Sequence, residues 1–134
     1  SDSCQSDQLF KYILSDRSSG VFNGKVIVRE KTKQTNANQS NKNLLLSPNA
    51  LMNANPQLEI YADDVKCSHG STTGQIDSEA LFYLRSRGIS QQRAMELIVS
   101  GFAKDIIDYI KNTDIKSYIS EYVFNWLEGS MKNV

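Results

Sequence analysis

In the first half of the chain, clusters of turn-forming residues rather than helical segments separate the apolar runs. Short β-branched or apolar runs, such as residues 26–28 and 44–46, alternate with clusters of Asn, Gly, Pro and Asp. Seven asparagines lie between Asn36 and Asn55, and we expect them at corners, where a short amide tolerates a left-handed backbone. The pattern predicts strands and turns, without intervening helices, for residues 1–76.

Two architectures accommodate such a succession of strands. One is a small antiparallel sandwich, and the other is a set of successive rungs of a β-solenoid. We expect the strands to be short, with a polar connection over residues 31–43. Strand spacing alone does not distinguish the two architectures, so both remain open at this point.

The hydrophobic period becomes helical in the second half of the chain. Asp77 and Ser90 are suited to cap the N-termini of two helices, and Gly88 is suited to follow the first helix in a left-handed conformation. A third helix is expected to begin near Asp114. The sequence therefore predicts a small helical region over residues 77–134.

Two apolar stripes follow from this helical period. We expect both to pack against each other and against the strands. The second stripe contains three aromatic residues, so it could alternatively dock a partner protein. The first stripe consists of Ala94, Leu97, Ile98, Phe102, Ile106, Tyr109 and Ile110, and the second of Ile115, Tyr118, Ile119, Tyr122, Val123, Trp126 and Leu127.

Composition excludes several classes of function. Basic and acidic residues both number 15, which leaves no net charge to attract nucleic acid or an anionic membrane. No apolar run approaches the roughly 20 residues that a membrane helix needs. The first residues lack the features of a secretory signal, and Cys4 and Cys67 are the only cysteines. We therefore expect a reducing, cytoplasmic setting without a disulfide framework.

One common nucleotide-binding motif is absent, and one class of catalytic site is restricted to a single residue. Residues 20–25, GVFNGK, resemble a phosphate loop but have one residue too few between the glycines and no Ser or Thr after Lys25. His69 is the single histidine, so any histidine-dependent triad within this chain would have to use it.

Cys67 and His69 are the side chains best suited to metal binding or nucleophilic catalysis. They occupy alternate positions of an expected strand and therefore share one face. A structural zinc site usually has four Cys or His ligands, whereas this chain adds only Cys4 and nearby carboxylates. A nucleophile and its base, or two structural residues, are the other interpretations. Any metal site formed by this pair would need ligands from another subunit.

Residues 56–70, PQLEIYADDVKCSHG, and residues 77–90, DSEALFYLRSRGIS, carry a resemblance to a known family. Both segments resemble the SufB/SufD family of the SUF system, which assembles iron–sulfur clusters. The segment KCSHG, residues 66–70, resembles the SufD branch, because the SufB branch has His-Glu where this chain has His69 and Gly70. Further blocks resemble the family in the same order, at residues 6–14, 20–25 and 43–47.

The resemblance spans about residues 4–111, and the helix expected from Asp114 is not matched in detail. It implies the terminal rungs of a right-handed parallel β-helix, over residues 1–76, followed by a C-terminal helical domain. It also implies that this chain is the C-terminal part of a longer one. An open rung would then expose unpaired backbone groups, so we expect the fragment to self-associate.

The family's role implies a non-enzymatic scaffold subunit that pairs with a SufB-type subunit and binds a SufC-type ABC ATPase. The resemblance makes His69 a ligand for iron or a nascent cluster, shared with a thiolate of the SufB-type partner, with Cys67 as a secondary candidate. No cofactor is expected in the isolated fragment. Residues flanking the helical stripes, namely Arg85, Arg87 and Arg93, are candidates for the ATPase contact.

Two other functions remain open. The chain could be an architectural clamp in the same complex, with His69 only hydrogen-bonded. It could also be a thiol enzyme that uses Cys67 as nucleophile and His69 as base.

Overall fold

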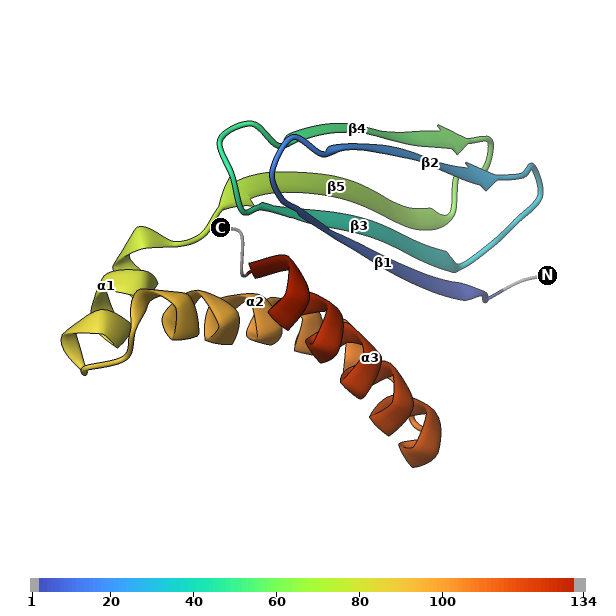
Figure 1. Ribbon diagram of the computed structural model, residues 1–134. Helices are drawn as coiled ribbons and strands as arrows, with labels where there is room; N and C mark the ends of the chain where they lie inside the picture. Colours follow the sequence, from blue (N-terminus) through green and yellow to red (C-terminus); the bar gives the residue numbers. More distant parts are fainter. Residues whose placement is uncertain (1–2, 132–134) are drawn as a thin grey trace.

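The computed structural model describes residues 3–131, which form five strands and three helices. The strands form two layers, and helices α2 and α3 lie along one side of them (Figure 1). The strands are β1 (Gln5–Leu14), β2 (Ser19–Val28), β3 (Thr35–Leu45), β4 (Leu51–Ile60) and β5 (Val65–Gln75), and the helices are α1 (Ser78–Ser86), α2 (Gln91–Ile107) and α3 (Thr113–Met131).

Successive strands alternate between two parallel sheets. The order is β1-β3-β5 in one sheet and β2-β4 in the other. Gln5 lies opposite Asn36, and Ser19 lies opposite Leu51, so strands of one sheet are about 30 residues apart in the chain. The antiparallel sandwich is therefore wrong. The arrangement of parallel sheets is compatible with a β-helix.

The expectations of short strands and of asparagines at corners are also wrong. Each strand has 10 or 11 residues, and β3 occupies most of the stretch expected to be a polar connection. The left-handed non-glycine residues are not asparagines, and Asn41 and Asn43 are instead buried in β3. Their amides hydrogen-bond each other at 2.7 Å, which allows polar side chains to occupy an interior position.

The space between the two sheets has an aromatic part and a polar part. The centre of the Phe22 ring lies 5.0 Å from the centre of the Phe10 ring and 6.4 Å from the centre of the Tyr12 ring. Gln39 is buried farther along β3, and a Cβ on Gly24 would lie 2.3 Å from its Oε1 atom. Glycine at position 24 therefore leaves the space that the Gln39 amide occupies.

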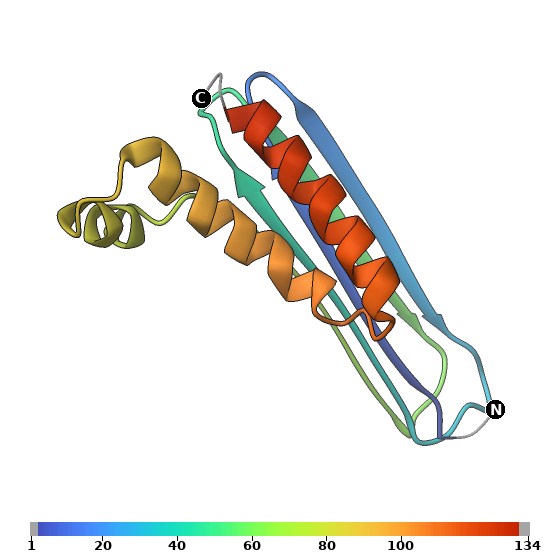
Figure 2. The ribbon, with the colours of Figure 1, turned by 60° about the horizontal axis from the view of Figure 1, so that its bottom comes forward.

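A second core lies between the three-stranded sheet and the helices. Leu44 and Leu46 pack against Val99, Ala103 and Leu127, so strand β3 contributes to both cores. Figure 2 shows α3 running along the strands, with α1 projecting away from them. The helices therefore cover only part of the sheet.

Lys11 joins strand β1 to helix α2. Its side chain is only 5% exposed, and its ammonium donates to the carbonyl oxygen of Phe102 at 2.7 Å and to Asp105 Oδ2 at 2.9 Å. The same ammonium lies 4.4 Å from the centre of the Phe102 ring. These contacts satisfy a charge that burial would otherwise make unfavourable.

The helix boundaries agree with the capping signals. Asp77 accepts a hydrogen bond from the Glu79 amide, and Ser90 accepts one from the Arg93 amide. Gly88 has a φ angle of +84°, as expected for a residue that follows a helix. The third helix begins close to Asp114, because the side chain of Asn112 accepts from two amides of its first turn.

The expected apolar stripes match the burial poorly. In α2, Ala94 of the expected stripe is buried and Phe102 packs against the core, but the other buried residues are Val99, Ala103 and Ile107, and Tyr109 is exposed. In α3, Leu127 is buried, but its three aromatic residues, Tyr118, Tyr122 and Trp126, are exposed. Packing therefore uses one edge of each stripe. Within the described residues, no helix is long and apolar enough to cross a membrane.

Candidate functional site

Cys67 and His69 lie in strand β5, as the sequence predicted. This strand is the last in its sheet, and among residues 3–131 it pairs only with β3. Register places Cys67 opposite Ala37 and His69 opposite Gln39. Because partners in a parallel ladder face the same side, both side chains belong to the row that continues the interior face of β3.

Burial differs between these neighbouring strands. Gln39 is only 2% exposed, whereas His69 is exposed and Cys67 is half-buried. The open side of β5 is therefore where the interior row reaches solvent. His69 is accessible to a second molecule while its backbone is held by a regular strand.

The open side of β5 also presents backbone hydrogen-bonding groups. The amide of Asn36 donates to the Cys4 carbonyl oxygen and that of Leu46 to the Leu14 carbonyl oxygen, so even-numbered residues of β3 bond to β1. The backbone amides and carbonyls of the odd-numbered residues of β3 consequently point toward β5. Alternate residues of a parallel strand form their backbone hydrogen bonds with opposite neighbouring strands. Register then directs the amide and carbonyl of His69 to the open edge.

The nearby carboxylates that could add ligands to Cys67 and His69 are those of Glu59, Asp63 and Asp64. Glu59 forms an ion pair, and the other two lie outside β5. Glu59 Oε1 accepts from Lys25 Nζ at 2.6 Å, and this contact raises the pKa of the Lys25 ammonium above its ordinary value. Asp63 and Asp64 lie in the connection between β4 and β5. Within the described residues, no group of three or more His, Cys, Asp and Glu side chains is arranged to hold a metal ion.

Cys4 precedes β1, whereas Cys67 lies in β5, on the far side of β3. Among the described residues, neither cysteine forms a disulfide. In the part of the chain that the structure describes, no hydrogen bond joins Cys67 to His69. The roles of Cys67 and His69 accordingly stay predictions.

The three candidate arginines lie on a different surface from β5. Arg85 and Arg87 are at the end of α1, and the Arg87 guanidinium lies 5.0 Å from the centre of the Tyr83 ring. Arg93 pairs with Glu96 at 3.0 Å in the first turn of α2. Beside them, Phe82 is 73% exposed, which is unusual for a large aromatic side chain on a helix.

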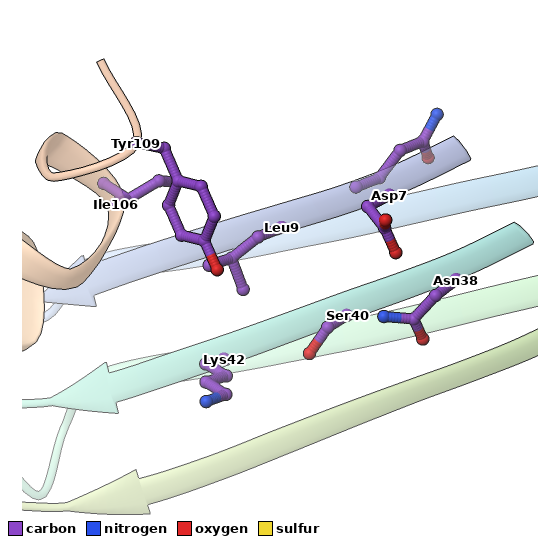
Figure 3. Close-up of a pocket in the computed structure, with 8 residues that line it drawn as sticks. Asp7, Leu9, Asn38, Ser40, Lys42, Ile106 and Tyr109 are labelled. Atoms are coloured by element: carbon purple, nitrogen blue, oxygen red, sulfur yellow. The ribbon is translucent and has the colours of Figure 1, made fainter. Parts of the chain in front are cut away.

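A groove that the sequence did not indicate lies on the outer face of the three-stranded sheet (Figure 3). Its volume is about 630 Å³, and the C-terminal end of α2 forms one wall. Asp7, Asn38 and Lys42 contribute polar groups from β1 and β3. Since even-numbered residues of β3 face outward, this groove lies on the opposite face from the row that includes His69.

Comparison with known proteins identifies relatives of this chain. The family model for the SufBD core domain, described as SUF system FeS cluster assembly, matches residues 1–102. Iron-sulfur cluster assembly protein SufD of Escherichia coli (strain K12) is 43% identical over 129 residues, which cover 96% of this chain and 30% of that protein. Its match must therefore include part of α3, beyond the limit expected from the sequence blocks.

Two further relatives give the same result. Iron-sulfur cluster assembly SufBD family protein slr0076 of Synechocystis sp. is 42% identical over 117 residues, covering 87% of this chain and 26% of the relative. Protein ABCI7, chloroplastic, of Arabidopsis thaliana is 40% identical over 119 residues, covering 88% of this chain and 25% of the relative. The chain thus spans less than a third of each of these three relatives. It belongs to the SufBD family of the SUF iron–sulfur cluster assembly system.

Proposed function

We propose that this chain is the terminal part of a SufD-type scaffold subunit, in which His69 helps to bind iron or a nascent iron–sulfur cluster at the interface with a SufB-type subunit. Family membership and the accessibility of His69 on an open strand support this proposal. The subunit acts without being an enzyme, in the cytoplasm. Its sheets form the last rungs of a right-handed parallel β-helix, the hand that parallel crossovers prefer.

The open edge of β5 is the proposed surface for the SufB-type subunit. A strand added there would bond to the backbone groups of the odd-numbered residues and lie next to His69. Ligands from the partner would complete a site for which one chain has too few soft ligands. Cys67 remains a secondary ligand candidate, because it lies in the same row two residues earlier.

The helices are the proposed surface for the SufC-type ATPase. Phe82 and Tyr83 on α1 are exposed, as are Tyr118, Tyr122 and Trp126 on α3. Exposed aromatic side chains are typical anchors of protein interfaces. Arg85, Arg87 and Arg93 lie beside α1 or at the start of α2 and would supply polar contacts at the margin.

The decisive experiment is performed on the full-length subunit co-expressed with its SufB-type and SufC-type partners. His69→Ala is compared with wild type and with Lys66→Ala, a control on the opposite face of the same strand. The complexes are purified without oxygen, and iron and sulfide are quantified. We expect all three complexes to assemble and only His69→Ala to lose the cluster.

A normal cluster in an intact His69→Ala complex would instead support an architectural clamp. A thiol enzyme is tested separately, by measuring the alkylation rate of Cys67 against pH. An ordinary thiol profile argues against an activated nucleophile. For the ATPase surface, the double substitution of Phe82 and Tyr83 by Ala should abolish co-purification of the SufC-type subunit and leave the SufB-type subunit bound.

The isolated chain is also proposed to self-associate through its open strands. Light scattering at increasing concentration tests this directly. A monodisperse monomer at high concentration would contradict it.

A further inference from the structure

Strand β3 carries a row of buried amides on the face that looks toward β2 and β4. Gln39, Asn41 and Asn43 form this row and are each less than 5% exposed. Their register partners are three successive inward positions of β5, of which the first is His69. Each amide therefore lies directly beside a polar β5 side chain on the same face.

Two of these three pairs are joined by side-chain hydrogen bonds. Ser71 Oγ donates to Asn41 Oδ1 at 2.8 Å. Asn43 Nδ2 donates to Thr73 Oγ1 at 3.1 Å. Polar side chains of β3 and β5 thus pair across the ladder at two of these three positions.

Gln39 and Asn43 each have a buried amide oxygen without a hydrogen-bond partner among the described residues, and of the two only Gln39 lies beside His69. The Gln39 Nε2 atom donates to Gln8 Oε1 at 2.9 Å, toward the strand on the other side. Its Oε1 atom is buried and has no hydrogen-bond partner within the described structure. A buried acceptor without a donor destabilises the fold, so a donor at the neighbouring position would be favourable. That position holds His69, whose ring carries an N–H.

We propose that Gln39 is a positioning residue for His69: its Oε1 atom accepts a hydrogen bond from one ring N–H and holds the neutral imidazole in a single tautomer. The inference rests on the proposed function, in which the other ring nitrogen binds iron. An imidazole whose second nitrogen is hydrogen-bonded presents its lone pair in a fixed direction, which strengthens metal binding. The bond requires the exposed His69 ring to rotate inward about its side-chain bonds, toward the Gln39 Oε1 atom, which lies near Gly24 of β2.

His69 makes the test simple, because it is the only histidine in the sequence. The ring nitrogens are observed by NMR in an ¹⁵N-labelled, tag-free chain at about pH 8.5, where an ordinary imidazole is neutral. We expect one nitrogen with the shift of a protonated atom and the other with that of a lone pair. Gln39→Met, which removes the acceptor, should move both shifts toward the average of the two tautomers.

Two further variants separate positioning from a general effect on the strand. Gln39→Glu keeps an acceptor at the same distance from the backbone and should restore the single tautomer. Asn38→Met changes the adjacent residue, which accepts from Ser68 on the opposite face, and should leave the His69 shifts unchanged. Averaged shifts in the folded wild type would overturn the inference, as would identical spectra for wild type and Gln39→Met.

The same variants are then placed in the complete complex. Gln39→Met should weaken iron binding about tenfold or more, as second-shell changes typically do. If His69→Ala removes the cluster but the tautomer is independent of Gln39, this inference fails and the proposed function stands. If the tautomer is fixed and the His69→Ala complex keeps a normal cluster, the contact is structural and the proposed function fails.

Discussion

Strands β3 and β5 lie side by side in one sheet, have the same length and carry similarly polar sequences, yet their environments are opposite. Five residues of β3 are buried, whereas no residue of β5 is. The difference arises because β3 has neighbours on both sides and β5 has one. Position in the sheet, rather than side-chain polarity, thus decides which strand is interior and which is available to a partner.

Hydrogen exchange should show the largest contrast. In β5 the register directs the amides of Gly70 and Thr72 toward β3, and those of His69 and Ser71 toward the open edge. At a dilution where the chain is monomeric, the first pair should exchange more slowly, on the order of a thousandfold. NMR-detected exchange measures this, and the β3 amides are the internal control.

A uniformly protected β5 would contradict the register. It would instead indicate that another strand already covers the edge. Repeating the measurement at high concentration distinguishes these outcomes, because self-association alone would make protection depend on concentration.

The next contrast concerns space beside the two strands. A Cβ on Gly24 would lie 2.3 Å from Gln39 Oε1 and 2.6 Å from Phe22 Cζ, so Gly24→Ala should lower the free energy of unfolding by about 1–3 kcal/mol. A Cβ on Gly70 in β5 would meet nothing within 4 Å. Gly70→Ala is therefore the matched control and should be neutral, as measured by urea unfolding.

Equal destabilisation by both substitutions would show that β5 is as tightly enclosed as β3. Equal tolerance would show that the Gln39 amide moves aside easily. The first result would mean that His69 is less accessible than its exposure indicates, and the second that the Gln39 amide beside it is not held in one position.

Hydrogen-bonded partners across the ladder give a smaller contrast. Asn41 accepts from Asn43 Nδ2 and Ser71 Oγ and is almost fully buried, so Asn41→Ala leaves two donors unpaired. We expect a loss of about 1–3 kcal/mol in the free energy of unfolding. Ser71→Ala removes only one donor from an exposed residue and should cost less than about 1 kcal/mol. Thermal unfolding monitored by circular dichroism provides the comparison, and a larger loss for Ser71→Ala would contradict it.

The contrast between these strands also explains which parts of the fold followed from the sequence. Capping residues such as Asp77 and Ser90 bond to amides within one helical turn, so residue identity alone predicts where these helices begin. Strand β3 was missed because amides, rather than apolar residues, occupy its interior face, and two of them form hydrogen bonds with residues of β5. Such bonds depend on residues about 30 positions away, which a local pattern does not contain.

The candidate site divides in the same way. The strand spacing correctly placed Cys67 and His69 in one strand and on one face. It could not show that His69 lies opposite Gln39, because this pairing of positions depends on the register between β3 and β5. The exposure of Tyr118, Tyr122 and Trp126 differs from the expected packing and leaves the alternative of a partner-docking stripe open, since the pattern of a stripe does not state which of its edges meets the sheet.

The smallest expected effect concerns the helical cover that β1 and β3 share. The Lys11 ammonium donates a hydrogen bond to Asp105 and lowers the pKa of its carboxyl group below the ordinary value. A carboxyl whose pKa is lower in the folded state stabilises the fold above its unfolded pKa, and this contribution is lost as the pH falls through the folded pKa. Asp105 is largely exposed, so Asp105→Asn should cost less than about 1 kcal/mol near neutral pH.

Acidification should therefore narrow the difference between wild type and Asp105→Asn, as followed by urea midpoints from pH 7 to pH 3. Asp63→Asn is the control, because this carboxylate makes no ion pair among the described residues. A difference that persists at low pH would mean that Asp105 acts through its shape or its hydrogen bonds rather than its charge. Lys11 would then hold α2 mainly through Phe102, and the cover over β1 and β3 would be insensitive to pH.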